Sequence, residues 1–128
     1  MNIIIFEDYN VKNLYPFSIN HSSFELKCGI YSNLDRIVNS FDDDVNYYLI
    51  VRDELKDLIQ EKFPRYMINP KEIPNGLYLN GAAIWNQNNI SKVQNGYAFS
   101  SSGNLVSFIS DTSIKYQDIN NTINKTSK

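Results

Sequence analysis

The chain of 128 residues is 42% hydrophobic, which is enough for one packed core and leaves no room for a second. Twelve lysines and arginines against 14 acidic residues give a net charge of -2, and no basic block exists, which argues against nucleic acid as a partner. No apolar run approaches the roughly 20 residues of a membrane span, and no signal-peptide pattern opens the chain. We therefore expect a cytoplasmic protein that binds neither membrane nor nucleic acid, and the single cysteine excludes an internal disulfide.

The first part of the chain starts with a strand pattern followed by a helix pattern. Asn2–Phe6 (NIIIF) is a β-branched apolar run, which predicts a strand that is covered on both faces. From Phe24 to Phe41 apolar residues recur at steps of three and four, which predicts a helix that begins near Gly29 or Ile30. Val45–Val51 (VNYYLIV) predicts the second strand.

The alternation continues with a second helix and a third strand. Glu54–Lys62 has one apolar face, with Asp53 as the expected N-cap and Pro64 as the stop signal. Arg65–Asn69 (RYMIN) predicts a short third strand. Strand, helix, strand, helix and strand in this order are typical of an α/β fold with right-handed crossovers and a mostly parallel sheet.

The pattern changes in the second half of the chain, where prolines and glycines mark turns. Leu77–Leu79 is a candidate short strand. Val93–Ser100 and Leu105–Ser110 flank a Ser-Ser-Gly-Asn turn, which predicts a hairpin. We expect a single α/β domain over residues 1–110, followed by a polar tail over 111–128 that is either a frayed terminus or a short helix.

A family resemblance is carried mainly by Leu14–Ile30. The first strand ends in the acidic pair Glu7-Asp8, Leu-Tyr-Pro-Phe-Ser follows from Leu14, and Glu-Leu-Lys-Cys-Gly-Ile follows from Glu25. This order resembles the sugar-nucleotidyltransferase-like proteins, relatives of the uridylyltransferase domain that makes UDP-N-acetylglucosamine. In that subgroup an acidic pair, a Leu-x-Pro-Leu-Thr segment and Glu-Leu-Arg-x-Gly-Ile occur in the same order. Tyr-Met-Ile-Asn, ending at Asn69, also resembles that subgroup.

The resemblance implies a Rossmann-like, three-layer nucleotidyltransferase-type domain. The reaction it implies is transfer of a nucleotidyl group from a nucleoside triphosphate to a sugar 1-phosphate, with Mg²⁺. These two substrates would be the partners of an active protein, and a homo-oligomer is left open. In open α/β sheets ligands bind at the carboxyl ends of the strands, so the phosphates are expected over the connection that follows the first strand.

The candidate site residues implied by the resemblance surround this connection. They are Lys27 as the catalytic residue, His21, Ser23, Glu25 and Asn69 as substrate-binding residues, and Glu7 and Asp8 as ligands of Mg²⁺. Several also have a purely structural interpretation. Lys27 can be a solvated or ion-paired lysine, His21 a surface residue, and Glu7 with Asp8 a simple turn at the end of a strand.

The chain departs from the wider superfamily at the positions where phosphate is bound. The Gly-rich loop after the first strand is missing, because no glycine occurs between Met1 and Cys28. His21 and Ser22 stand in place of Arg-Pro, and Ser23 stands in place of a phosphate-binding lysine. Two function classes follow: a nucleotidyltransferase, or a non-catalytic module that binds a nucleotide or sugar or serves as a structural or oligomerisation partner. Whether the chain is an enzyme is left open.

Overall fold

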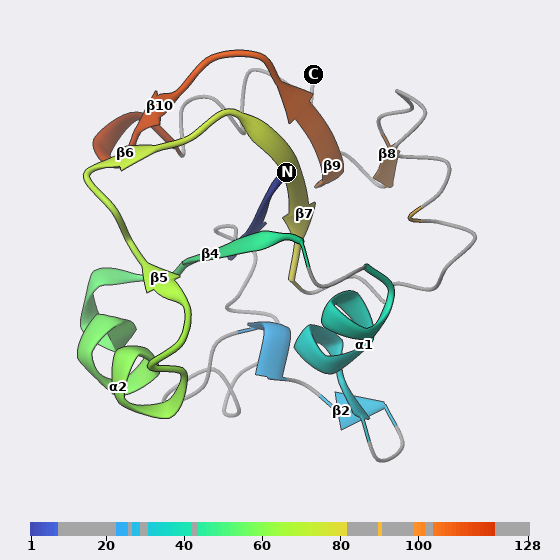
Figure 1. Ribbon diagram of the computed structural model, residues 1–128, viewed down its shortest axis with the longest axis vertical. Coiled ribbons are helices and arrows are strands. Elements are labelled where there is room, and N and C mark those ends of the chain that lie inside the picture. The colour runs from blue at the N-terminus through green and yellow to red at the C-terminus, as the bar shows by residue number, and fades with distance from the viewer. Residues whose placement is uncertain are drawn as a thin grey trace.

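The structure is a computed structural model, and it describes residues 1–7, 23–25, 27–28, 31–41, 44–81, 90, 99–101 and 104–119. Its main element in these ranges is a sheet in the order β5-β4-β1-β7-β9-β8 (Figure 1). The strands of this sheet are β1 (Asn2–Phe6), β4 (Asn46–Ile50), β5 (Met67–Ile68), β7 (Gly76–Asn80), β8 (Phe99–Ser101) and β9 (Asn104–Ser110).

Parallel pairing dominates the first four strands of the sheet. β1 pairs in parallel with β4 and with β7, and β4 pairs in parallel with β5. β9 then pairs antiparallel with β7 and with β8. The expected Rossmann-like α/β fold with a mostly parallel sheet is therefore confirmed, and so is the hairpin of β8 and β9. The portion 93–98 of the predicted hairpin lies outside the described residues.

Different elements cover the two faces of the sheet. Among the described residues, the helices α1 and α2 lie on one side, and a short two-stranded sheet with a 3₁₀ turn lies on the other (Figure 1). The helices are α1 (Asn33–Asn39) and α2 (Lys56–Lys62), and the opposite layer contains β6 (Glu72–Ile73), β10 (Ile114–Lys115) and η5 (Tyr116–Asp118). This arrangement agrees with the predicted three layers.

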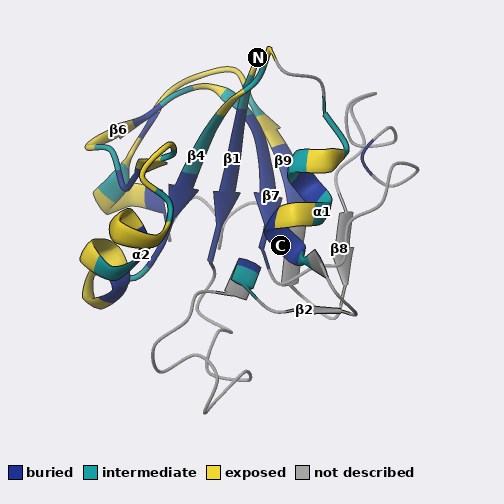
Figure 2. Cartoon of the chain, turned by 60° about the horizontal axis from the view of Figure 1, so that its bottom comes forward, coloured by how far each residue is buried: buried dark blue, intermediate teal, exposed yellow. Residues whose placement is uncertain are grey.

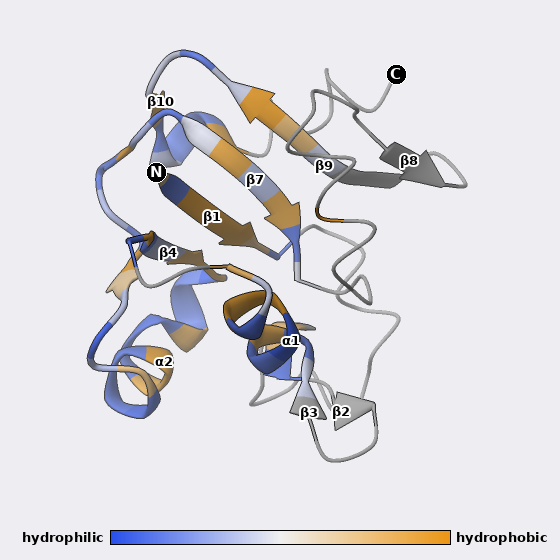
Figure 3. Ribbon diagram, turned by 45° about the vertical axis from the view of Figure 1, so that its right-hand side comes forward, coloured by the Kyte–Doolittle hydropathy of each residue, from blue (hydrophilic) through white to orange (hydrophobic). Residues whose placement is uncertain are grey.

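The alternation of side chains along β1 builds both halves of the core. Ile3 and Ile5 join the cluster that includes residues of α1 and α2, whereas Ile4 and Phe6 join the cluster that includes residues of β6 and β10. All four are fully buried, in agreement with the dark blue that covers most of β1 in Figure 2, and β1 is strongly apolar in Figure 3. Successive side chains of a strand point to opposite faces, so the predicted double burial of this strand is confirmed.

Close backbone approach at the start of β7 requires a glycine. A Cβ atom on Gly76 would lie 2.3 Å from the carbonyl oxygen of Asn2, which is far inside van der Waals contact. The pairing of β1 with β7 starts one residue later, where Ile3 lies opposite Leu77. Gly76 therefore lets β7 reach the edge of β1, and this sets the register that brings their carboxyl ends together.

The helix expected from Phe24 to Phe41 is shorter than predicted. A 3₁₀ turn, η3 (Ser23–Glu25), and two short antiparallel strands, β2 (Lys27–Cys28) and β3 (Tyr31–Ser32), come first. The expected start near Gly29 or Ile30 is wrong, because the helix begins at Asn33 after a capping box. Ser32 Oγ accepts a hydrogen bond from the Asp35 backbone at 3.1 Å, and the Asp35 carboxylate accepts one from the Ser32 backbone at 3.0 Å.

The predicted N-cap of the second helix is also wrong. Asp53 is the first residue of a 3₁₀ turn, η4 (Asp53–Leu55), and α2 follows from Lys56 without a side-chain cap. The Asp53 carboxylate lies instead 2.9 Å from the hydroxyl of Tyr116. The Asp53 carboxylate therefore binds Tyr116, which is distant in the sequence, and not the helix terminus to which local sequence rules assign it.

The first residues after Ser110 pack onto the sheet. Ile114 and Lys115 pair with β6, and the buried side chains of Ile114 and Ile119 join the core cluster of Ile4 and Phe6. Residues 111–119 contain the strand β10 and the short 3₁₀ helix η5, so of the two forms expected for this segment the short helix is present over three residues. The remainder of the predicted tail lies outside the described residues.

Candidate functional site

Polar residues follow the carboxyl ends of the parallel strands, which meet at one edge of the sheet (Figure 2). Glu7 follows β1, Arg52 lies two residues beyond β4, Asn69 follows β5, and Asn80 ends β7. Glu7, Asn69 and Asn80 are buried. This carboxyl edge is where open α/β sheets bind their ligands, so it is the candidate functional site.

Glu7 is held by the segment that follows β4. Its carboxylate is almost fully buried, and Oε2 lies 3.2 Å from Arg52 Nε in an ion pair. The same oxygen accepts a hydrogen bond from the Arg52 backbone at 3.2 Å. A buried carboxylate needs such compensation, since removal of one partner from a buried pair costs about 3–5 kcal/mol. Glu7 and Arg52 therefore link the ends of β1 and β4.

Asn69 links the ends of β5 and β4 through its side-chain amide. Its Oδ1 accepts a hydrogen bond from Val51 N at 2.8 Å, and its Nδ2 donates one to Val51 O at 2.9 Å. The amide therefore reproduces a pair of sheet hydrogen bonds beyond the last ladder residue. Asn69 and Glu7 both bind the Val51-Arg52 segment, so the structure brings these two predicted site residues to one place.

Tyr116 closes this network from the opposite layer. Its hydroxyl lies 2.8 Å from Val51 O and 2.9 Å from Asp53 Oδ1, and it accepts a hydrogen bond from Asn69 Nδ2 at 3.3 Å. A hydroxyl has one proton, so it donates to one of the two oxygen acceptors at a time. Burial, then the hydrogen bond to Asp53 and nearby negative charges, raise the pKa of the Tyr116 hydroxyl above its usual range.

Asn33 anchors the start of α1 to the same edge. Its side chain is buried, and Nδ2 donates a hydrogen bond of 2.9 Å to the carbonyl of Gly81 at the end of β7. The Gly81 backbone in turn donates 2.8 Å to Phe6 O. The first residue of α1 therefore lies beside the ends of β7 and β1.

The backbone pairing of Lys27 places this residue near the start of α1. It lies in β2 opposite Ser32, the N-cap residue of α1. The sequence places Lys27 near a helix start, and in the structure β3 comes between it and α1 along the chain. The structure describes the backbone of Lys27 and Ser23 but not their side chains, and His21 and Asp8 lie outside the described residues.

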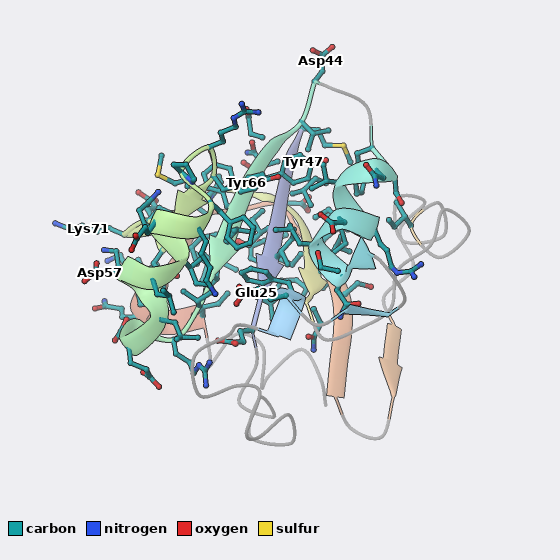
Figure 4. All side chains as sticks on the ribbon, turned by 90° about the horizontal axis from the view of Figure 1, so that it is seen from below. Glu25, Asp44, Tyr47, Asp57, Tyr66 and Lys71 are labelled. Atoms are coloured by element: carbon teal, nitrogen blue, oxygen red, sulfur yellow. The ribbon has the colours of Figure 1, made fainter. Side chains whose placement is uncertain are left out.

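Glu25 has a partner on α2. Its Oε1 lies 2.9 Å from Lys62 Nζ, so the ion pair joins η3 to the end of that helix. Figure 4 labels Glu25, the last residue of η3. Its neighbour Phe24 is fully buried and meets Phe63 edge-on, with ring centroids 6.1 Å apart. These contacts fasten the connection between β1 and α1 to α2.

A comparison with protein families shows which family the chain belongs to. The model of a family described as sugar nucleotidyl transferase matches residues 3–127, which is nearly the whole chain. This chain belongs to the sugar nucleotidyl transferase family. No curated protein and no solved structure matches it. The resemblance inferred from Leu14–Ile30 is confirmed, and the match extends it beyond Pro74.

The family implies Mg²⁺, which takes oxygen ligands, mostly carboxylates and phosphates. Among the described residues no three His, Cys, Asp or Glu side chains gather in one place. The Glu7 carboxylate already balances Arg52. Asp8, the other proposed ligand of Mg²⁺, lies outside the described residues, and we derive no step through the ion. Among the residues that the structure describes, no helix has the length and apolar character that a membrane span needs.

Sequence patterns did not identify three residues that lie at the carboxyl edge of the sheet. Arg52 carries the charge that balances Glu7, Tyr116 joins Val51 to Asp53, and Asn33 fixes the start of α1. Arg52 offered a weak signal, because a charged residue directly after an apolar strand stands at a carboxyl end. Tyr116 and Asn33 offered none, because their partners are distant in the chain.

Proposed function

We propose that this chain transfers a nucleotidyl group from a nucleoside triphosphate to a sugar 1-phosphate. A phosphate oxygen of the sugar 1-phosphate forms a bond to the α-phosphorus of the triphosphate. The bond from the α-phosphorus to the bridging oxygen breaks, and pyrophosphate leaves with the electron pair. The family match over residues 3–127 is the observation that carries this proposal.

The residues proposed for phosphate binding are Lys27, His21 and Ser23. Lys27 would balance negative charge on the phosphates as a point charge. The pairing of β2 with β3 supports this role, because it holds the Lys27 backbone opposite Ser32, next to the helix that Asn33 anchors to the carboxyl edge. His21 would add charge when protonated.

For Asn69 and Glu25, the contacts favour positioning roles within the proposed site. The Asn69 amide is occupied by the Val51 backbone, and the Glu25 carboxylate is paired with Lys62. Each would shape the substrate site by holding a backbone segment. Mg²⁺, proposed with Glu7 and Asp8 as ligands, would neutralise phosphate charge when bound. The ion pair with Arg52 counts against Glu7 in that role.

A test of the proposed reaction measures pyrophosphate. The full chain is incubated with UTP, CTP, dTTP or ATP, with a sugar 1-phosphate, and with or without Mg²⁺. We expect pyrophosphate release with at least one pair of substrates and thermal stabilisation by the matching triphosphate. Lys27→Ala should abolish both, Lys27→Arg should keep part of both, and Arg65→Ala, at an exposed position before β5, should leave both unchanged.

A non-catalytic binding module is the second candidate. The Glu7–Arg52 ion pair and the missing Gly-rich loop favour it, because the first occupies a proposed metal ligand and the second removes a phosphate cradle. Stabilisation by a triphosphate or a sugar phosphate without any pyrophosphate would support this candidate. Absence of both stabilisation and pyrophosphate with all four triphosphates would reject the transferase.

A further inference from the structure

A groove of about 480 Å³ lies at the amino ends of β4 and β5, whereas the candidate functional site lies at their carboxyl ends. The groove bends around the edge of the sheet. Tyr47 and Tyr66 pack with the core cluster on the helix side, and Tyr48 packs with the cluster on the other side. In the described part of the chain, β5 is the last strand at this edge, so no further strand covers the groove.

The described residues that line this groove have the composition of a protein–protein contact. They include three tyrosines, Met67 and Arg65, and they include no lysine, aspartate or glutamate, although 20% of the chain is charged. Tyrosine, methionine and arginine are enriched at protein interfaces, whereas lysine and acidic residues are depleted there. The Met67 side chain is 55% exposed, and methionine adapts its shape to a partner. The lining therefore favours a protein as the occupant.

Aromatic contacts hold two of the tyrosine rings in place. The rings of Tyr47 and Tyr66 meet at 89° with centroids 5.8 Å apart, and the Phe63 ring lies 6.0 Å from that of Tyr66 (Figure 4). The Tyr47 hydroxyl also donates a hydrogen bond of 3.5 Å to Val38 O. Rigid tyrosine rings offer a large contact area at a low cost in conformational entropy. The groove is therefore ordered before any partner binds.

Two opposite charges border the groove, and neither forms an ion pair with another residue that the structure describes. Arg65 is exposed in the lining, and Asp44 is exposed directly before Val45, the first lining residue. Figure 4 shows Asp44 projecting from the body of the molecule at the turn before β4. Burial and then Asp35 raise the pKa of the Tyr66 hydroxyl, and Arg65 lowers it, so the Arg65 charge acts at this ring.

We infer that this groove binds a second copy of the chain, in a twofold dimer in which the groove of each copy faces that of the other. Every contact in a twofold interface occurs twice, so Arg65 of each copy can pair with Asp44 of the other. The surface carries both members of this pair beside its aromatic and apolar side chains, and it is therefore complementary to itself in charge. The inference goes beyond the proposed transfer reaction, because it requires neither Lys27 nor the carboxyl edge.

Analytical ultracentrifugation of the full chain tests this inference. Sedimentation equilibrium over about 5–500 μM covers micromolar dissociation constants. We expect an equilibrium of monomer and dimer that weakens with added salt, because salt screens ion pairs between exposed side chains. In NMR spectra of the ¹⁵N-labelled chain, the amides of Tyr48 and Met67 should shift on dilution, and that of Asn33 at the carboxyl edge should not.

Charge reversals provide matched variants. Arg65→Glu and Asp44→Lys should each weaken association at least about tenfold, because each places two pairs of like charges in a twofold interface. An equimolar mixture of both variants should associate to within about threefold of the unsubstituted chain, since their mixed dimer contains only pairs of opposite charge. Lys71→Glu is the control, because Lys71 is an exposed cation in the connection that follows β5. It should leave association within about twofold of the unsubstituted chain.

Three results would overturn the inference. These are a monomer at all concentrations, no recovery of association in the mixture of the two variants, and equal weakening by Arg65→Glu and Lys71→Glu. The result is separate from the pyrophosphate assay, in which Arg65→Ala is expected to change nothing. Association without nucleotidyl transfer supports the inference alone, and transfer by a chain that stays monomeric rejects it alone.

Discussion

At the residue scale, Asn69 combines an unusual backbone conformation with a buried side chain. Its φ of 45° lies in the left-handed region, which costs most residues about 1–2 kcal/mol and which asparagine and glycine tolerate best. The amide meanwhile binds both backbone groups of Val51. Asparagine therefore meets both requirements here: it tolerates this φ, and its amide supplies the two hydrogen bonds.

Substitutions at Asn69 separate these two contributions. Asn69→Ala should lower the free energy of unfolding by about 2–4 kcal/mol, because it removes the two hydrogen bonds to Val51 and the one to the Tyr116 hydroxyl and retains the strained φ. Asn69→Gly should cost about 1 kcal/mol less, because glycine relieves the strain. Urea denaturation of both variants and the unsubstituted chain measures these differences. An alanine variant as stable as the glycine variant would contradict the assignment of strain.

Tyr116 should give the protein a specific sensitivity to alkali. Its raised pKa means that the folded state retains the phenolic proton more strongly than the unfolded chain, whose tyrosines ionise near pH 10. The stabilisation is complete below about pH 10 and is lost as the pH rises above it. Tyr116→Phe should be less stable by about 1 kcal/mol at pH 7, and this deficit should shrink at higher pH.

Urea denaturation at several pH values from 7 to about 11 measures this effect. Other tyrosines titrate in both proteins, so their contributions cancel in the difference between Tyr116→Phe and the unsubstituted chain. Parallel stability curves for the two proteins above pH 10 would show that the Tyr116 proton is not held more tightly in the folded state.

At the scale of elements, the capping box decides where α1 begins and therefore what precedes it. The apolar repeat continues upstream of Asn33, so periodicity alone cannot find the boundary. Ser32 and Asp35 can, because each satisfies a backbone N–H group of the other at the helix terminus. The residues up to Ser32 then form the β2–β3 pair that contains Lys27.

Ser32→Ala should therefore reduce stability by about 1 kcal/mol. Asp35→Ala should cost a similar or smaller amount, and the double variant should cost less than the sum of both because the two side chains act on one helix turn. Chemical denaturation of the four proteins gives this coupling energy. Strictly additive losses would indicate that the two side chains stabilise the chain independently.

At the scale of the whole molecule, the segment after Ser110 covers one face of the central sheet. Ile114 packs in the cluster of Ile4, Phe6 and Tyr78, and Tyr116 fixes the end of β4. Without this segment, the face of β1 and β7 opposite the helices would lose part of its cover. The polar composition of the segment conceals this role, because only two of its described side chains are buried.

A pair of isoleucines tests this role. Ile114 is 9% exposed in β10, whereas Ile109 in β9 is 48% exposed. Ile114→Ala should lower the free energy of unfolding by about 2–4 kcal/mol through lost burial and the cavity that remains. Ile109→Ala should cost less than about 1 kcal/mol. Equal losses in urea denaturation would show that β10 does not seal the core.

The sequence by itself determined the α/β class, the buried first strand, the hairpin and the family. These depend on hydrophobic periodicity and on short motifs, which are local properties of the chain. Sequence reasoning also placed Glu7 and Asn69 in the region of the candidate site, since both directly follow apolar strands. Helix boundaries were less predictable, because capping and 3₁₀ turns compete with periodicity over a few residues.

Only the tertiary structure decided how the carboxyl edge is held together. The contacts of Glu7 with Arg52, of Asn69 with Val51 and of Tyr116 with Val51 join residues 45, 18 and 65 positions apart. No local pattern encodes such contacts, because they arise when strand pairing and burial force distant polar groups to satisfy one another.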